Sequence, residues 1–217
     1  MRKLKLDNKS LLLYAITDRS WLNKRMLSEV VEEAILGGAT FIQLREKELE
    51  YDEFLKSAME VKAVTDKYKI PFVINDNVDI AVAVDADGAH IGQSDEEIRT
   101  ARKKLGPDKI IGLSAVTVEE AVRAEQNGAD YIGVGAVFNT STKLDAGIVS
   151  FETLKEICKA VKIPVVAIGG ISGNNALELA GTGIAGISVI SAIFAQDDIK
   201  IAASKLLRLT EQIVVTF

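Results

Sequence analysis

Residues 165–191 read VVAIGGISGNNALELAGTGIAGISVIS, and this stretch decides the fold. It holds two short apolar, β-branched runs, Val165–Gly169 and Ile187–Ser191, which have the length of buried strands. Between them Asn174–Ala180 has helical periodicity. It is followed by Gly181-Thr182-Gly183, where glycine can end a helix in the left-handed conformation. This order of strand, helix and strand predicts one β–α–β unit with parallel strands.

The same unit recurs along the chain at intervals of roughly 20 to 30 residues, as expected of a strand followed by its crossover helix. Eight strands are predicted, at Leu12–Thr17, Phe41–Arg45, Phe72–Asn75, Ala89–Gly92, Ile110–Ser114, Tyr131–Val137, Val165–Gly169 and Ile187–Ser191. Helices are predicted at Leu27–Leu36, Tyr51–Tyr68, Glu96–Leu105, Val118–Gln126, Phe151–Ala160, Asn174–Ala180 and Ile199–Ile213. Because no change of composition divides the series, we predict a single domain over residues 1–217, with residues 1–10 as a short N-terminal extension.

Two architectures can hold eight such units: a closed (β/α)₈ TIM barrel and a doubly wound open sheet. An open sheet usually carries a glycine-rich turn after its first strand, whereas this first strand ends Ile16-Thr17-Asp18-Arg19. Glycine-rich phosphate signals instead follow the seventh and eighth strands, beginning with Gly169-Gly170, where barrels commonly place a phosphate site. We therefore predict an α/β fold in which eight parallel strands close into a barrel with the helices outside.

Composition excludes several classes of protein. The 217 residues carry a formal net charge of −5 without the clustered positive charge that nucleic acids or membrane surfaces attract. The one cysteine, Cys158, cannot form an internal disulfide, and its helical segment favours a partly buried structural thiol over a nucleophile. Leu11-Leu12-Leu13 is too short for a secretory signal or a membrane span. We expect a cytoplasmic protein with small-molecule partners, and whether it forms a homo-oligomer stays open.

The second strand places long polar side chains where a barrel has its interior, or lumen. Because side chains alternate along a strand, Ile42 and Leu44 are expected to face the helices, and Gln43, Arg45 and Lys47 to face the lumen. Such groups are unfavourable there unless they are paired. They could form a buried network that holds the barrel closed, or they could bind a ligand. Ligand binding is favoured, most of all for Lys47, since barrel active sites lie at the C-terminal ends of the strands.

Two carboxylates follow neighbouring strands at this same end of the barrel. Asp76 comes directly after the third strand, and Asp95 comes just after the fourth. Either could simply cap a helix, and Asp95 before Glu96-Glu97 fits that interpretation well. Two carboxylates without a third protein ligand are also the usual way of holding one Mg²⁺, whose shell is completed by substrate phosphate and water. Lys47 and Lys143 would then meet the remaining negative charge.

Hydroxyl groups and glycines follow the later strands. Ser114 is expected in the lumen, and Gly133 and Gly135 leave space on the lumen side of the sixth strand. The stretch Thr140-Ser141-Thr142-Lys143 after that strand is typical of a phosphate or pyrophosphate cradle. Backbone N–H groups at Gly169-Gly170 and at the end of the eighth strand predict a second phosphate site.

Two further residues, a histidine and a tryptophan, each allow a structural and a functional interpretation. His90 is the only histidine, and its inward position suggests a base. A lone histidine on a strand is nevertheless more often a hydrogen-bonded core residue, and we favour that interpretation. Trp21, after the first strand, could stack on a ligand or cap the loop.

Taken together, these motifs resemble the thiamine phosphate synthase family over nearly the whole chain. The resemblance rests on Gln43-Leu44-Arg45-Glu46-Lys47, Asn75-Asp76, His90-Ile91-Gly92-Gln93-Ser94-Asp95, Ser114, Thr140-Ser141-Thr142-Lys143, Gly169-Gly170 and Ile190-Ser191, in that family's order. One departure is Asn139, which stands where the family often has proline before the Thr-x-Thr-Lys stretch.

The resemblance implies a transferase of thiamine biosynthesis. It would join 4-amino-2-methyl-5-hydroxymethylpyrimidine diphosphate to 4-methyl-5-hydroxyethylthiazole phosphate, releasing pyrophosphate. The pyrimidine diphosphate would be bound by Gln43, Leu44, Arg45, Glu46, Lys47, Asn75, Ser114 and Lys143. The thiazole phosphate would be bound by Thr140, Ser141, Thr142, Gly170, Ile190 and Ser191. Asp76 and Asp95 would hold Mg²⁺, and Lys47, Ser114 and Lys143 would be catalytic.

The family's reaction is dissociative, so it needs stabilisation of a leaving group more than acid–base chemistry. The chain supplies cations and hydrogen-bond donors and shows no obvious catalytic dyad. Three alternatives stay open. A thiazole tautomerase on the same barrel would have no use for the pyrophosphate residues. A sugar-phosphate epimerase or a tryptophan-pathway barrel would share the phosphate site after the seventh and eighth strands, but the epimerase would need more metal-binding histidines than one. A barrel that only binds thiamine phosphates differs from the synthase by its lack of turnover.

Overall fold

The computed structural model describes residues 6, 8–22, 24–92, 95–140 and 147–214, without the side chains of residues 95–97. The strands are β1 Leu13–Ile16, β2 Phe41–Leu44, β3 Phe72–Asn75, β4 Gly88–Ile91, β5 Ile110–Ala115, β6 Tyr131–Val134, β7 Val165–Ile168 and β8 Gly186–Val189. The helices are α1 Leu27–Leu36, α2 Tyr51–Tyr68, α3 Val78–Ala83, α4 Asp95–Leu105, α5 Val118–Gln126, α6 Phe151–Ala160, α7 Ser191–Phe194 and α8 Ile199–Val214. Short 3-10 turns lie at η1 Asn8–Leu11, η2 Arg19–Trp21 and η3 Ala176–Leu179.

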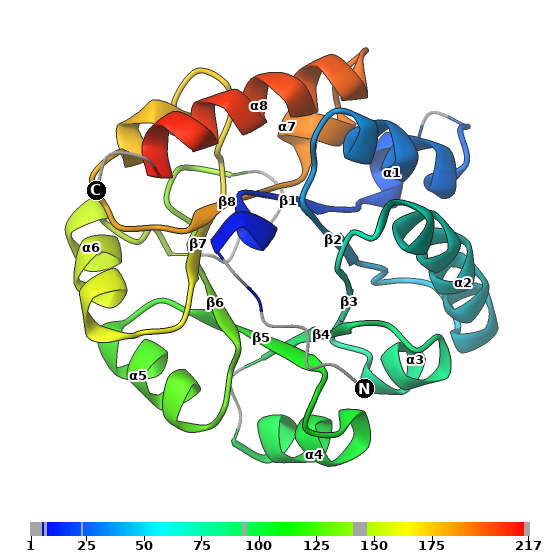
Figure 1. Cartoon of the computed structure of the whole chain (residues 1–217), viewed down its shortest axis with the longest axis horizontal. Helices are drawn as coiled ribbons and strands as arrows, with labels where there is room; N and C mark the ends of the chain where they lie inside the picture. The colour runs from blue at the N-terminus through cyan, green and yellow to red at the C-terminus, as the bar shows by residue number, and fades with distance from the viewer. Residues whose placement is uncertain (1–5, 7, 23, 93–94, 141–146, 215–217) are drawn as a thin grey trace.

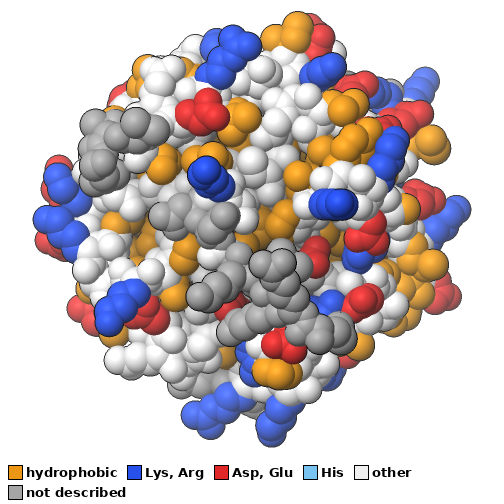
Figure 2. All heavy atoms as spheres, in the orientation of Figure 1, with side chains coloured by type: hydrophobic (Ala, Val, Ile, Leu, Met, Phe, Trp, Pro, Cys, Tyr) orange, Lys and Arg blue, Asp and Glu red, His pale blue; other side chains and the backbone are white. Residues whose placement is uncertain are grey.

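The eight strands form a closed parallel barrel in chain order, so the predicted fold is confirmed. Closure is made by β8 against β1, where Tyr14 lies opposite Ser188. In Figure 1 the helices form a ring around the strands, and η1 lies over the centre of the barrel. Lys and Arg side chains alternate with Asp and Glu side chains around the edge of this face in Figure 2.

The helix boundaries follow the sequence pattern closely, with three exceptions. Residues 176–179 form the 3-10 turn η3 where a longer α-helix was predicted, because Asn175 bonds back to Ser172 and Gly170 and holds the chain in a turn. The short helices α3 and α7 were not predicted, since six and four residues are too few to show a helical period. Asn77 caps α3 by accepting the N–H of Ile80 at 3.0 Å.

Two strands end at least two residues earlier than predicted. The β6 ladder ends at Val134, although Val137 and Phe138 still donate to carbonyl groups of residues 168 and 169. The β8 ladder ends at Val189, and Ser191 opens α7. In both cases the chain leaves the ladder at the mouth of the barrel, where it forms the loops around the candidate site.

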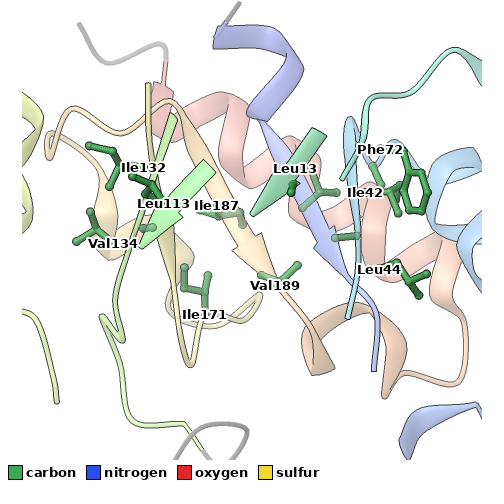
Figure 3. Close-up of a cluster of buried hydrophobic side chains, with 14 of the residues drawn as sticks. Leu13, Ile42, Leu44, Phe72, Leu113, Ile132, Val134, Ile171, Ile187 and Val189 are labelled. Atoms are coloured by element: carbon green, nitrogen blue, oxygen red, sulfur yellow. The ribbon is translucent and has the colours of Figure 1, made fainter. Parts of the chain in front are cut away.

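Side chains alternate between two apolar layers, as the barrel geometry requires. Ile42 and Leu44 belong to the outer layer between strands and helices, so the predicted orientation of β2 is confirmed. Figure 3 shows this layer, with Leu13, Ile187 and Val189 projecting from β1 and β8 beside Ile42 and Leu44 of β2. The lumen holds a separate cluster of Leu11, Tyr14, Ile16, Phe41, Val73, Ile110, Tyr131 and Val166.

Cys158 on α6 is partly buried, in agreement with the sequence-based expectation of a structural thiol. Burial raises the pKa of the Cys158 thiol to about 12. The thiolate, which is the reactive form, is therefore scarce at neutral pH. Among the described residues, no helix combines the length and the apolar character that are needed to cross a membrane.

A matched pair of glycine substitutions tests the packing of the lumen. A Cβ atom on Gly112 would lie 2.1 Å from Cζ of Tyr131, whereas one on Gly133 would meet its nearest neighbour, Cε1 of His90, at 3.5 Å. We expect Gly112→Ala to lower the free energy of unfolding by about 2 kcal/mol through overpacking, and Gly133→Ala to change it by less than about 0.5 kcal/mol. Denaturant unfolding measures both values, and equal losses would contradict the described packing.

Candidate active site

A cleft of about 860 Å³ opens at the mouth of the barrel, beside the C-terminal ends of β2, β3 and β4. Residues that follow these strands line it together with residues of α2, α3 and α4. Its polar lining includes Lys47, Asn75, Asp76, Asp79 and Lys104. The sequence analysis placed three of these, Lys47, Asn75 and Asp76, in a site at this end of the barrel.

Lys47, Asn75 and Asp76 form one cluster inside the cleft. Nζ of Lys47 lies 2.8 Å from Oδ2 of Asp76, and Nδ2 of Asn75 donates to the same oxygen at 2.7 Å. The Asp76 backbone N–H donates to the carbonyl of His90 at 2.8 Å, which ties the end of β3 to β4. Asp76 has a φ of 60°, in the left-handed region that Asp and Asn adopt more readily than most residues. About half of each side chain in the Lys47–Asp76 pair is exposed, so the pair can exchange partners with a ligand.

The neighbouring Glu46 is held in a different way. Arg19, from the turn after β1, donates from Nε and Nη2 to the two carboxylate oxygens of Glu46 at 3.1 and 2.9 Å. The same guanidinium donates to Oγ of Ser57 on α2 at 3.1 Å. The Glu46 side chain is only 4% exposed, so the bidentate pair fixes the segment that carries Arg45 and Lys47.

Arg45 directly precedes Glu46 in the chain and belongs to neither ion pair. Its backbone N–H donates to Oγ1 of Thr17 at 3.1 Å, which joins the ends of β1 and β2. Among the described residues the Arg45 guanidinium forms no hydrogen bond or ion pair, although the residue is only partly exposed. A guanidinium in this position is suited to an anionic ligand.

Inside the lumen, five polar side chains from five strands form one hydrogen-bonded series, which we name the lumen row. Nε2 of Gln43 donates to the hydroxyl of Tyr14, and the hydroxyls of Tyr14 and Tyr131 lie 2.7 Å apart. The Tyr131 hydroxyl lies 2.9 Å from Nδ1 of His90, and Nε2 of His90 lies 3.1 Å from Oγ of Ser114. The predictions that Gln43 and Ser114 face the lumen are therefore confirmed. His90 is hydrogen-bonded as expected, although the residue is only partly buried.

Burial keeps the two tyrosines of the lumen row uncharged. Desolvation is the largest cause that raises the pKa of Tyr14, and two side-chain hydrogen bonds oppose it. Desolvation also raises the pKa of Tyr131 well above its ordinary value, and the neighbouring Tyr14 adds to this effect. Both groups are therefore neutral hydrogen-bonding hydroxyls across the physiological pH range.

The loops after β6, β7 and β8 meet on the other side of the mouth. Gly169 and Gly170 have φ values of 97° and 66°, which L side chains rarely adopt. A Cβ atom on Gly170 would lie 2.3 Å from the carbonyl oxygen of Asn139, so the β7 loop needs glycine to pack against the β6 loop. Thr140 ends the described part of that loop. Ile190, with Ser191 directly after it, lies at the junction of β8 and α7.

Several predicted site residues cannot be placed in this geometry. Ser141, Thr142 and Lys143 lie outside the described residues. Asp95 is the first residue of α4, the helix that follows β4 in the chain, but its side chain is outside the described set. Trp21 lies in η2 and is 40% exposed.

Sequence reasoning missed three polar residues that shape the site: Arg19, Tyr14 and Tyr131. Arg19 follows the first strand without a recognisable motif, and no spacing rule links it to Glu46 across 27 residues. Tyr14 and Tyr131 fall at lumen positions of their strands, which strand alternation could have indicated. Their contact across 117 residues depends on barrel closure and leaves no local signal.

The chain is similar to proteins of one family. Residues 13–193 match the sequence profile of thiamine monophosphate synthase. The thiamine-phosphate synthase of Ruminiclostridium cellulolyticum is 54% identical over 197 residues, covering 91% of this chain and 94% of that protein. The thiamine-phosphate synthase of Clostridium acetobutylicum is 56% identical over 188 residues, covering 87% and 89%. The solved thiamine phosphate pyrophosphorylase of Pyrococcus furiosus has a TM-score of 0.87 and 42% identity, covering 95% and 98%.

The two ion pairs of the site should differ in their effect on stability. Arg19→Ala leaves a nearly buried carboxylate without its main donor, so we expect the free energy of unfolding to fall by about 1–2 kcal/mol. Lys47→Ala removes one half of an exposed pair, so we expect a change below about 0.5 kcal/mol. Urea titration of both variants measures the difference. A larger loss for Lys47→Ala than for Arg19→Ala would show that the roles of the two pairs are reversed.

Proposed function

The chain belongs to the thiamine monophosphate synthase family, and we propose that it makes thiamine phosphate from a hydroxymethylpyrimidine diphosphate and a hydroxyethylthiazole phosphate. The observation that carries this proposal is the cluster of Lys47, Asn75 and Asp76 in the cleft, because a diphosphate substrate requires such a site. The reaction forms a C–N bond and releases pyrophosphate, so the protein is a transferase.

The diphosphate would bind between the cleft and the top of the lumen. Lys47 can leave Asp76 for a phosphate oxygen, and the partly exposed Arg45 guanidinium can bind another. Ser114 and Asn75 would add neutral polar groups to this site. Gln43, Leu44, Glu46 and Lys143 complete the pyrimidine diphosphate residues that the family resemblance implies. For Glu46 a positioning role is supported, because Arg19, which also donates to Ser57, already binds both of its carboxylate oxygens.

The residues at the β3 and β4 ends fit Mg²⁺. Asp76 offers an exposed carboxylate inside the cleft, and Asp95 follows the neighbouring strand. Oxygen ligands of this kind suit a small hard cation that keeps phosphate and water in its shell. We propose that Asp76 and Asp95 hold one such ion, whose chemistry when bound is to neutralise charge on the diphosphate oxygens.

The proposed reaction is dissociative. The bond between the pyrimidine methylene carbon and the diphosphate oxygen breaks, and its electron pair leaves with pyrophosphate. The thiazole nitrogen then donates its lone pair to the methylene cation and forms the new C–N bond. Lys47, Arg45 and Lys143 stabilise the charge that develops on the leaving group, and no protein base is required. The barrel walls hold the two substrates in line.

The thiazole phosphate would bind at the opposite side of the mouth. Gly170 brings the backbone after β7 close to the β6 loop that carries Thr140, Ser141 and Thr142. Ile190 and Ser191 follow β8 at the position where barrels commonly bind phosphate. The two phosphate groups would thus be held apart on either side of the lumen, with the reacting atoms between them.

Product formation tests the function directly. Purified protein should convert the two substrates with Mg²⁺ into thiamine phosphate, detected by oxidation to fluorescent thiochrome, and EDTA should abolish the product. Tautomerase activity on thiazole phosphate without synthase activity would assign the chain to an isomerase. Binding of thiazole phosphate without any turnover would indicate a carrier or sensor.

The cleft offers a matched pair of lysines for testing the diphosphate site. Lys47 and Lys104 both pair with an aspartate in the cleft, and their side chains are 51% and 45% exposed. We expect Lys47→Ala to lower kcat at least roughly a hundredfold, because charge stabilisation of the leaving group is lost, while Lys104→Ala stays within about threefold of wild type. Steady-state kinetics measures both. Wild-type turnover in Lys47→Ala would place the pyrophosphate elsewhere.

A further inference from the structure

In the lumen row, the donor and acceptor groups determine which residue donates in each hydrogen bond. The Gln43 amide nitrogen can only donate, so the Tyr14 oxygen accepts from it. Among the described residues, the Tyr14 hydroxyl has only one other hydrogen-bond partner, the Tyr131 hydroxyl. The Tyr14 proton therefore goes to the oxygen of Tyr131. The opposite choice would leave a fully buried Tyr14 proton without an acceptor.

The same reasoning carries through to the mouth of the barrel. Because the Tyr131 oxygen accepts from Tyr14, its own proton is directed to Nδ1 of His90 at 2.9 Å. An imidazole whose Nδ1 accepts a hydrogen bond carries its proton on Nε2. That Nε2–H donates to Oγ of Ser114 at 3.1 Å, so the Ser114 hydroxyl receives a hydrogen bond from inside the barrel.

The surroundings of His90 hold its ring in this orientation. The Tyr131 ring packs against the imidazole with centroids 5.5 Å apart. Gly133, on the same strand as Tyr131, leaves the space beside Cε1 of His90 that a larger side chain would narrow. Burial keeps both tyrosines protonated by raising the pKa of each, so both hydroxyls serve as neutral donors and acceptors.

We propose that the lumen row fixes His90 as the Nε2–H tautomer and thereby makes Ser114 a hydrogen-bond donor toward the bound diphosphate. The proposal rests on the proposed function, which places the diphosphate at Ser114. With its oxygen occupied by the N–H of His90, the Ser114 hydroxyl directs its proton away from the imidazole. His90 is then a positioning residue: it sets the polarity of Ser114 and takes no proton from the substrate.

The tautomer can be observed directly, because His90 is the only histidine in the chain. Protein labelled with ¹⁵N-histidine gives one pair of ring-nitrogen signals, and their couplings to the two ring-carbon protons identify each nitrogen. We expect a protonated Nε2 and a bare Nδ1 in the wild type, and a loss of this preference in Tyr131→Phe. A protonated Nδ1 with a bare Nε2, or a Tyr131→Phe spectrum identical to wild type, would overturn the proposal. The spectrum needs no turnover, so it is independent of the proposed function.

Two substitutions of His90 separate positioning from simple packing. A Gln side chain can place its amide N–H near the position of Nε2, whereas the shorter Asn side chain reaches only the position of Nδ1. We expect His90→Asn to lower kcat by roughly ten- to hundredfold with a smaller change in KM, and His90→Gln to recover at least roughly tenfold of that loss. Equal losses in the two variants would overturn the positioning role.

The control is Tyr68→Phe, which removes a hydroxyl that donates to Glu32 between α2 and α1, far in the fold from the lumen row. It should retain wild-type kcat and the wild-type histidine spectrum. A wild-type protein with the expected spectrum and no thiamine phosphate synthesis would contradict the proposed function while the tautomer assignment held.

Discussion

Closure of the parallel ladder is the constraint on which the rest of this structure depends. Once β8 pairs with β1, alternate side chains of all eight strands share one enclosed interior whose volume is fixed. The rings of Tyr14, Phe41 and Tyr131 pack against one another in this interior, with centroids 4.6 to 5.8 Å apart. Gly112 provides the space that the Tyr131 ring occupies. Polar atoms in such an interior must find partners there, and the lumen row is the result.

Two ion pairs follow β2, one nearly buried and one exposed, and they have different roles. Arg19 and Glu46 form a bidentate and nearly buried pair that fixes the end of β2, whereas Lys47 and Asp76 form an exposed pair in the cleft. The first arrangement holds the backbone in place, and the second presents charges that a ligand can reach. One segment of the sequence, residues 45–47, thus combines a fixed frame with groups that can change partners.

Sequence reasoning worked wherever a regular period governs the structure. The faces of Ile42 and Leu44, the lumen positions of Gln43 and Ser114, and the long helices all follow from alternation or a 3.6-residue repeat. It failed for elements that are too short to show a period and for contacts between residues far apart in the sequence. The helix α3 is too short to show a period, and the Tyr14–Tyr131 contact joins positions 117 residues apart. The roles of Asp76 and Asp95 at a metal stay a prediction, since strand ends specify proximity and not coordination.

The neutrality of the lumen and the proposed chemistry support one another. A charged base at the position of Tyr14 or Tyr131 would lose its hydration in a fully buried site, a loss that the tyrosines avoid because burial raises the pKa of each. An interior of this kind is poorly suited to proton abstraction and well suited to holding neutral rings beside a charged mouth. The proposed displacement, in which the leaving group carries away the electron pair, would make use of both the neutral lumen and the charged mouth. In the proposed reaction the charge would develop near Lys47 and Arg45, at the opening of the barrel, while the hydrogen-bonded lumen row would fix the orientation of the groups that meet it.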